Sequence, residues 1–382
     1  MTAPLILKRA VLLSIVYLLP NAACTQSGPQ TFESQRHRFR VVTLTDDLEH
    51  PWGLAFLPDG RMLVTERPGR LRIVQQDGTI GAPLSGVPAV AADGQGGLLD
   101  VVLAPDFAQS RTIYLSYSEP GDGGGAGTSV ARARLGGGDN ALENVQVVFR
   151  QEPKVSGGSH FGSRLVFARD GNLFITTGDR QNRQFVQDLS KLQGKVIRIR
   201  PDGAIPRDNP FVNRQGARPE IWSYGHRNIQ GAALHPETGQ IWTVEHGARG
   251  GDELNAPKAG KNYGWPVITY GRDYSGASIG EGQRKEGMEQ PVHYWDPSIA
   301  PSGLMFYTGD RFPNWKGNVF VGALGYRLLA RLELDGERVR AEERLLDGMS
   351  ERIRAVVQGP DGCIYVLTDD NDGRIMRIEP VS

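Results

Sequence analysis

The sequence predicts an all-β protein that folds as a six-bladed β-propeller with four-stranded blades. Three observations lead to this prediction. A hairpin-like pattern recurs six times along the chain, and the 382 residues include 49 glycines and 24 prolines, which is typical of many tight turns. No long stretch has the 3.6-residue apolar period of a helix. Many short strands in one long chain are therefore expected, with few helices.

Each copy of the pattern is an apolar strand, a turn rich in Pro, Asp and Gly, and a second apolar strand. The copies cover residues 52–66, 98–117, 164–178, 231–245, 303–321 and 354–368. Further strands follow several copies, as at residues 69–74, 195–199 and 374–378. One hairpin cannot bury its apolar face alone, whereas hairpins arranged radially can. Spacings of roughly 45 to 75 residues favour propeller blades over a two-sheet sandwich, which has closer and more even strands.

The N-terminal part of the chain is predicted to lie outside this domain. Lys8 and Arg9 precede an apolar run at residues 10–19, and Ala22-Ala-Cys24 follows, which is the layout of a secretory signal. The alternative is a membrane anchor, but the run is about half the length needed to span a bilayer. We predict a signal peptide over 1–24, a polar linker over 25–38 and the propeller over 39–382. The protein is then exported, to the periplasm or beyond.

The two cysteines and the charge balance restrict the partners. Cys24 also fits a lipoprotein box, made imperfect by Asn21, so a lipid on Cys24 is the one membrane contact that we expect. Cys363 lies in an apolar strand pattern and is predicted to be a buried thiol. Acidic and basic residues number 43 each, and this balance argues against a nucleic-acid partner.

Several polar segments lie at the boundaries of the repeats, where propeller loops gather around the central channel. They are residues 93–97, 157–160, 223–228, 245–248 and 351–354. Arg227, Arg352 and Arg354 would place several cations in one pocket, which suits a ligand with several carboxylates. His160 is a candidate base near neutral pH. Zinc motifs are absent from the sequence, whereas calcium needs only oxygen ligands.

Taken singly, these residues also have plainer interpretations. His160 alone is more typical of a turn, and His226 of a packed structural histidine. Arg352 and Arg354 would fit a solvated strand face, and Asp252 with Glu253 would fit surface acids.

Taken together, the segments resemble the soluble PQQ-dependent aldose sugar dehydrogenases of the glucose/sorbosone dehydrogenase family (PQQ is pyrroloquinoline quinone). The resemblance runs from His50-Pro-Trp-Gly-Leu-Ala-Phe-Leu-Pro-Asp-Gly60 to Tyr365-Val-Leu-Thr368, nearly the whole mature chain. Its most specific stretches are Ser223-Tyr-Gly-His-Arg-Asn-Ile-Gln-Gly231, Gly251-Asp-Glu-Leu-Asn255 and Lys261-Asn-Tyr-Gly-Trp-Pro266.

The resemblance implies a six-bladed propeller that holds PQQ and Ca²⁺ over its channel and oxidises aldose sugars. By motif, His160 is similar to the general base that takes the proton of the sugar C1 hydroxyl, while the hydride passes to PQQ and a lactone forms. The cofactor-binding positions would be Gln95, Arg227, Asn228, Arg352 and Arg354. Backbone carbonyls of Gly247 and Ala248 would hold the catalytic calcium, and Glu253 and Tyr263 would belong to a second, structural calcium site.

One departure from the family pattern bears on the cofactor. Some family members place a lysine against the cofactor where this chain has Gly325, and Arg327 is the nearest candidate to replace that cation. Two alternatives to the dehydrogenase therefore stay open: a calcium-dependent lactonase or other hydrolase, and a non-catalytic binding propeller. The first needs carboxylate ligands from several blades, whereas the predicted pocket is richer in arginine. The sugar, the electron acceptor and the oligomeric state cannot be read from the sequence.

Overall fold

The protein is described here by a computed structural model that covers Met1 and residues 29–381. The predicted signal peptide with Cys24, and the first residues of the predicted linker, lie outside the described residues. Export and lipid attachment therefore stay predictions. No helix in the described part of the chain combines the length and apolar character that crossing a membrane requires.

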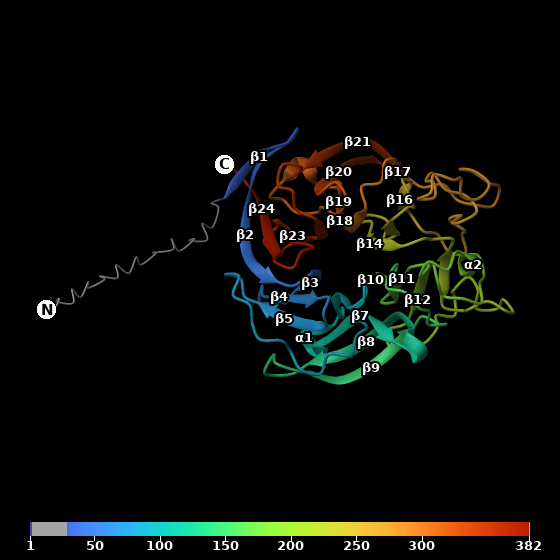
Figure 1. Cartoon of the computed structure of the whole chain (residues 1–382), viewed down its shortest axis with the longest axis horizontal. Helices are drawn as coiled ribbons and strands as arrows, with labels where there is room; N and C mark the ends of the chain where they lie inside the picture. The colour runs from blue at the N-terminus through green and yellow to red at the C-terminus, as the bar shows by residue number, and fades with distance from the viewer. Residues whose placement is uncertain (2–28, 382) are drawn as a thin grey trace.

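The described chain forms six antiparallel sheets arranged as a ring, so the predicted six-bladed propeller is confirmed (Figure 1). The six predicted hairpins are the first two strands of the six blades. Consecutive first strands contact one another, and the first strand of blade 6 contacts that of blade 1, which closes the ring.

Most blades have the expected four strands, in chain order from the channel outward. Blade 1 has three, namely β3 (Pro51–Phe56), β4 (Met62–Glu66) and β5 (Arg70–Val74). Blade 2 contains β6 (Leu98–Leu103), β7 (Thr112–Pro120), β8 (Ala126–Leu135) and β9 (Leu142–Arg150). Blade 3 contains β10 (Gly162–Phe167), β11 (Leu173–Thr177), β12 (Lys195–Ile199) and β13 (Ile221–Tyr224).

The second half of the ring repeats this order. Blade 4 contains β14 (Ile229–Leu234), β15 (Ile241–Glu245), β16 (Asp252–Asn255) and β17 (His293–Trp295). Blade 5 contains β18 (Pro301–Phe306), β19 (Val319–Ala323), β20 (Leu328–Asp335) and β21 (Arg338–Leu345). Blade 6 contains β22 (Ile353–Gln358), β23 (Ile364–Thr368), β24 (Gly373–Pro380), β2 (Arg38–Leu48) and β1 (Gln30–Glu33). The described α-helices are one turn each, α1 (Phe107–Ser110) and α2 (Arg183–Val186), and 3₁₀ turns occupy Asp122–Gly124 and Pro313–Trp315.

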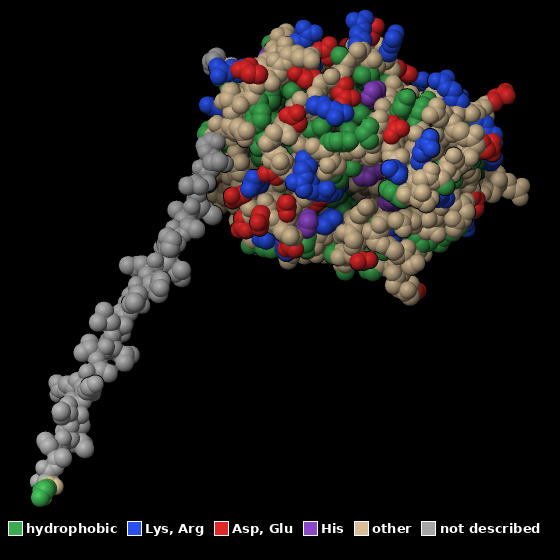
Figure 2. All heavy atoms as spheres, turned by 45° about the horizontal axis from the view of Figure 1, so that its top comes forward, with side chains coloured by type: hydrophobic (Ala, Val, Ile, Leu, Met, Phe, Trp, Pro, Cys, Tyr) green, Lys and Arg blue, Asp and Glu red, His purple; other side chains and the backbone are tan. Residues whose placement is uncertain are grey.

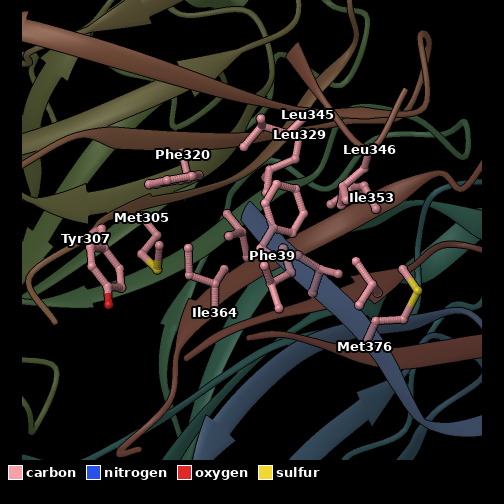
Figure 3. Close-up of a cluster of buried hydrophobic side chains, with 14 of the residues drawn as sticks. Phe39, Met305, Tyr307, Phe320, Leu329, Leu345, Leu346, Ile353, Ile364 and Met376 are labelled. Atoms are coloured by element: carbon pink, nitrogen blue, oxygen red, sulfur yellow. The ribbon is translucent and has the colours of Figure 1, made fainter. Parts of the chain in front are cut away.

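Blade 6 joins the two ends of the chain. Strand β2 pairs with β24, so the last strand of the sequence lies beside one of the first. Phe39 of β2 is fully buried in a cluster that includes Leu329 of blade 5 and Ile353 and Ile364 of blade 6 (Figure 3). This apolar packing holds the ring closed.

The propeller begins earlier than the predicted boundary at residue 39. Residues 30–33, which we predicted as part of a polar linker, form β1 and pair with β2. The reason is local: Phe32 stacks on Phe39, with ring centroids 5.5 Å apart, which adds an apolar contact to an otherwise polar strand.

Glycine residues allow the tight turns that join the first strand of a blade to the second. In blade 1, Gly60 has φ +86° and its N–H donates to the carbonyl of Leu57 at 2.9 Å. Gly171 of blade 3 has φ +81° and donates to Ala168 at 3.0 Å in the same way. Glycine adopts such left-handed conformations at low cost, whereas a residue with a Cβ is strained there.

Every first strand has a β-bulge near its start, where the pairing register with its neighbour shifts. A bulge bends a strand and redirects a side chain. Because the first strands line the channel, the six bulges redirect side chains around one end of it. The outer surface, by contrast, mixes acidic and basic side chains on the face shown in Figure 2, as the zero formal net charge leads one to expect.

Candidate functional site

The bulged strand starts surround a cavity of about 190 Å³ at one end of the channel. All six blades contribute to its wall, which includes Trp52, Leu99, Gly162, Gln230, Ala300 and Arg354 at or next to the first strands. Three predicted site residues line it, namely Gln95, Arg352 and Arg354. A larger cavity of about 650 Å³ lies between blades 2 and 3 and contains none of the predicted site residues, so it is not the site described here.

The cavity is positively charged. Arg67, Arg352 and Arg354 line it together with one carboxylate, Asp369. Arg354 donates to Asp369 at 2.6 Å and to Gln230 at 3.0 Å, and Arg352 donates to the same Asp369 oxygen at 3.3 Å. Burial alone would raise the pKa of Asp369, but Arg354, His50 and Arg67 lower it strongly, so this carboxyl is ionised. Arg354 is 5% exposed, which excludes the solvated strand face that was its plainer interpretation.

His160 is paired with a buried aspartate that the sequence did not single out. Its Nδ1 lies 2.7 Å from Oδ1 of Asp179, which is 1% exposed. His160 has φ +59°, a left-handed conformation that costs free energy for a residue with a side chain and that gathers at functional sites. Gln95 Oε1 accepts from the backbone N–H of His160 at 2.8 Å and holds this conformation.

The pairing determines which nitrogen of His160 is a base. Burial raises the pKa of Asp179, but its hydrogen bond and charge interactions with His160, and the charge of Arg227, lower it overall. An ionised carboxylate can only accept, so Nδ1 carries the hydrogen and Nε2 keeps its lone pair. The second oxygen of Asp179 accepts from Trp265 Nε1 at 2.9 Å, which fixes the carboxylate plane.

A second histidine, His246, lines the cavity but is unsuited to be the base. Its Nε2 lies 2.7 Å from the carbonyl of Pro301, so this nitrogen is the donor. Burial, reinforced by the charge of Arg227, lowers the pKa of His246 to about 3. A group with so low a pKa holds a proton poorly near neutral pH. His160 is therefore the better base of the two.

Arg227 and Asn228 lie between these two histidines. The backbone N–H of Asp179 donates to the carbonyl of Arg227, and the Arg227 guanidinium lies 5.3 Å from the centre of the Trp265 ring. Three buried nitrogens in this region have no hydrogen-bond partner among the described residues: Arg227 Nε, Asn228 Nδ2 and Arg354 Nε. Buried donors rarely stay unpaired, and a ligand with several acceptor oxygens would satisfy them.

The residues predicted for calcium fall in two places. Gly247 and Ala248 follow His246 in a tight turn, where Asp252 Oδ1 accepts from the N–H of Gly247 at 2.8 Å. A Cβ on Gly247 would lie 2.2 Å from the carbonyl oxygen of Gly250, so only glycine fits there. Asp252 is fully buried, not a surface acid.

Glu253 and Tyr263 do not line the cavity. Glu253 shares the amide of Asn255 with Glu245, each oxygen being 3.0 Å from Asn255 Nδ2. Burial and the charge of Glu245 raise the pKa of Glu253 to about 8. In the described part of the chain, no three His, Cys, Asp or Glu side chains gather as a metal-binding group, so calcium would depend on backbone oxygens as well.

His226 is a packed residue, in line with its plainer interpretation. It is fully buried, stacks on Tyr263, and links Ser223 Oγ at 2.9 Å to Glu245 Oε1 at 2.8 Å. The order serine, histidine, acid resembles a hydrolytic triad, but Ser223 is also fully buried and meets no substrate.

Sequence reasoning missed Asp179, Asp369 and Arg67, and it missed the contact of Trp265 with Asp179. A signal for the acids was present: in four blades an acidic residue ends the second strand or follows its end within two residues, namely Glu66, Asp179, Glu245 and Asp369. Period-2 strands bring such residues to the same end of the channel. For Arg67 the sequence holds no comparable signal, whereas Trp265 lies in the distinctive stretch 261–266.

The fold and site define a six-bladed propeller with an arginine-rich cavity beside a paired histidine. The chain belongs to the glucose/sorbosone dehydrogenase family, whose model matches residues 48–377. It is 53% identical to the aldose sugar dehydrogenase YliI of Escherichia coli (strain K12), over 89% of this chain and 92% of that protein. A crystal structure of a glucose dehydrogenase has a TM-score of 0.88 and 56% identity, covering 90% of this chain and 99% of its own. The PQQ-bound aldose sugar dehydrogenase of Streptomyces coelicolor has a TM-score of 0.74 and 30% identity, covering 89% and 97%.

Proposed function

We propose that this protein oxidises aldose sugars at C1 to the lactone, with PQQ as bound electron acceptor, calcium as its metal and His160 as general base. The observation that carries the proposal is the cavity in which three arginines and one carboxylate lie next to the His160–Asp179 pair. The cavity suits an anionic cofactor, and the pair suits proton removal from a hydroxyl. The dehydrogenase names of the relatives support the same reaction class.

The residues present fit a cofactor with several carboxylates. Arg352 and Arg354 would bind it from blade 6, and Arg227 and Asn228 from the segment before blade 4, with Gln95 at the rim. The unpaired Nε of Arg227 and Arg354 and Nδ2 of Asn228 would gain acceptors. The carbonyls of Gly247 and Ala248 would contribute to the calcium that accompanies the cofactor.

Removal of the proton from the sugar hydroxyl would be carried out by residues of the chain. PQQ, when bound, supplies the two-electron acceptor. Nε2 of His160 takes the proton of the C1 hydroxyl, and the resulting imidazolium is stabilised by Asp179 through the Nδ1–H bond of 2.7 Å. Because Asp179 is itself held by Trp265, the pair does not need to reorganise as charge develops.

Reconstitution tests the proposal directly. We expect the purified protein to bind PQQ at micromolar concentration in the presence of Ca²⁺ and then to reduce an artificial acceptor with aldoses. Oxidation of the sugar to its lactone would be followed by chromatography. Failure to bind PQQ would overturn the proposal, and hydrolysis of added lactones without PQQ would favour the hydrolase instead.

The proposed second calcium site at Glu253 leads to a separate prediction. Two neighbouring carboxylates joined by one amide repel each other when both are ionised, and a divalent cation would relieve this repulsion. At a calcium concentration about 100-fold above Kd, binding stabilises by about 2.7 kcal/mol, or roughly 5 °C in Tm. We expect Glu253→Gln to lose most of this shift in the PQQ-free protein, measured by differential scanning fluorimetry.

The matched control for this measurement is Glu237→Gln, at an exposed acid in the β14–β15 turn. It should keep the full calcium shift. An equal shift in wild type and Glu253→Gln would place the stabilising calcium elsewhere.

A further inference from the structure

Arg67 is an arginine of the cavity to which the resemblance gives no role. It follows β4 directly, and its backbone is held from two blades: its N–H donates to the carbonyl of His50 at 3.1 Å, and its carbonyl accepts from Leu98 at 3.0 Å. The side chain is partly buried and lines the cavity beside Arg352 and Arg354. Its backbone is therefore fixed where blades 1 and 2 meet, and its side chain lies in the wall shared with blade 6.

The described residues leave Arg67 without a salt-bridge partner. The only carboxylate of the cavity wall is Asp369, whose Oδ1 is engaged by His50 at 3.0 Å and whose Oδ2 is shared by Arg352 and Arg354. The adjacent acid, Glu66, is in turn paired with Arg70 and Arg72, both at 2.7 Å. In the cavity wall, three positively charged guanidinium groups thus face a single negatively charged carboxylate.

Such an arrangement is unfavourable unless an anion compensates it. Burial lowers the pKa of Arg67, and although Asp369 opposes this, Arg354 and Arg352 lower it further. Clustered like charges that destabilise a folded protein are typical of binding sites for the opposite charge.

The obvious substitute cation, Arg327, lies elsewhere. Its guanidinium donates to the carbonyl of Ser350 at 2.9 Å, its side chain is exposed, and it does not line the cavity. Gly325 does line the cavity, but a Cβ there would lie 3.0 Å from the carbonyl oxygen of Ile299, so a side chain has little room. Arg327, the candidate substitute that the sequence offers, therefore does not reach the cavity.

We propose that Arg67 binds a carboxylate of the anionic cofactor and is the cation that the Gly325 position lacks. The proposal rests on the proposed function for the identity of the ligand, but the anion site itself rests on the cavity. Blade 1 would then contribute to cofactor binding together with blade 6, its neighbour in the ring.

The test compares Arg67→Met, Arg67→Lys and the control Arg327→Met. We expect Arg67→Met to weaken PQQ binding in Ca²⁺ at least tenfold, by fluorescence titration, while the Tm of the cofactor-free protein is unchanged or raised because like-charge repulsion is relieved. Arg67→Lys should retain part of the affinity, since it keeps the charge but not the planar fork. Arg327→Met should stay within twofold of wild type. An unchanged Kd in Arg67→Met overturns the proposal, whatever the Tm of the variant.

A second measurement separates this proposal from the identity of the cofactor. Citrate, a small polycarboxylate, should raise the Tm of cofactor-free wild type more than NaCl does at the same ionic strength, and Arg67→Met should lose that excess. If wild type fails to bind PQQ but shows the citrate effect through Arg67, the proposed cofactor is wrong and the anion site stands. If wild type and Arg67→Met respond equally to citrate, the anion site is wrong whatever the cofactor.

Discussion

Replacing His160 by alanine is expected to lower kcat with an aldose by about 10²- to 10⁴-fold, the range for loss of a general base. The protein should still bind PQQ, because the arginines that would hold the cofactor come from other segments. Steady-state kinetics at saturating PQQ and a PQQ titration measure the two effects separately. The loss should appear in kcat, with KM for the sugar little changed.

The backbone of His160 calls for a second variant. Alanine at φ +59° is strained, so a loss in His160→Ala could arise from a shifted loop. Asparagine tolerates this conformation better, and His160→Asn should therefore keep the Tm while losing the same turnover. Added imidazole should restore part of the activity of His160→Ala. Normal turnover in both variants would remove His160 from the mechanism.

Asp179→Asn is expected to reduce turnover by at least about 10²-fold without removing the histidine. The amide must present its oxygen to Trp265 Nε1, which leaves its NH₂ group facing His160 Nδ1. The imidazole would then carry its hydrogen on Nε2, where a base needs a lone pair. The variant is nearly isosteric, so PQQ affinity should stay close to that of wild type.

Two controls sharpen this prediction. Asp188→Asn changes an exposed acid of the same insert and should leave turnover unaltered. Because His160 and Asp179 act as one unit, the double variant His160→Ala/Asp179→Asn should be no slower than His160→Ala alone. Additive losses would mean that Asp179 acts on the reaction by another route.

The fold could be predicted from the sequence because its signals are local. Each hairpin carries its own turn, such as Asp59-Gly60, and the apolar runs that flank it. The β1 strand could not be predicted from the sequence. Its stability depends on the contact of Phe32 with Phe39, which exists only once β2 has formed. Propensity within a short polar strand is too weak to predict such a contact.

The candidate site was predictable where a motif is contiguous and not where distant segments meet. Arg227 and Asn228 lie in one distinctive segment, and Arg352 and Arg354 lie two apart at the start of β22. Asp179 meets His160 at the open end of the β10–β11 hairpin, and Trp265 reaches Asp179 from an insert between β16 and β17. Arg67 was missed because its role depends on which carboxylates its neighbours have already engaged, and this is visible only in three dimensions.

The pairing of β2 with β24 also imposes an order of assembly. Arg352, Arg354 and Asp369 lie in blade 6, which is complete only when a strand from the start of the chain joins one from its end. Arg67 enters the same wall from blade 1. A chain whose two ends have not yet met thus has no complete cation cluster, and under the proposed function cofactor binding would follow ring closure. Because a ligand stabilises only the state that binds it, the bound cofactor would then favour closed rings over open ones.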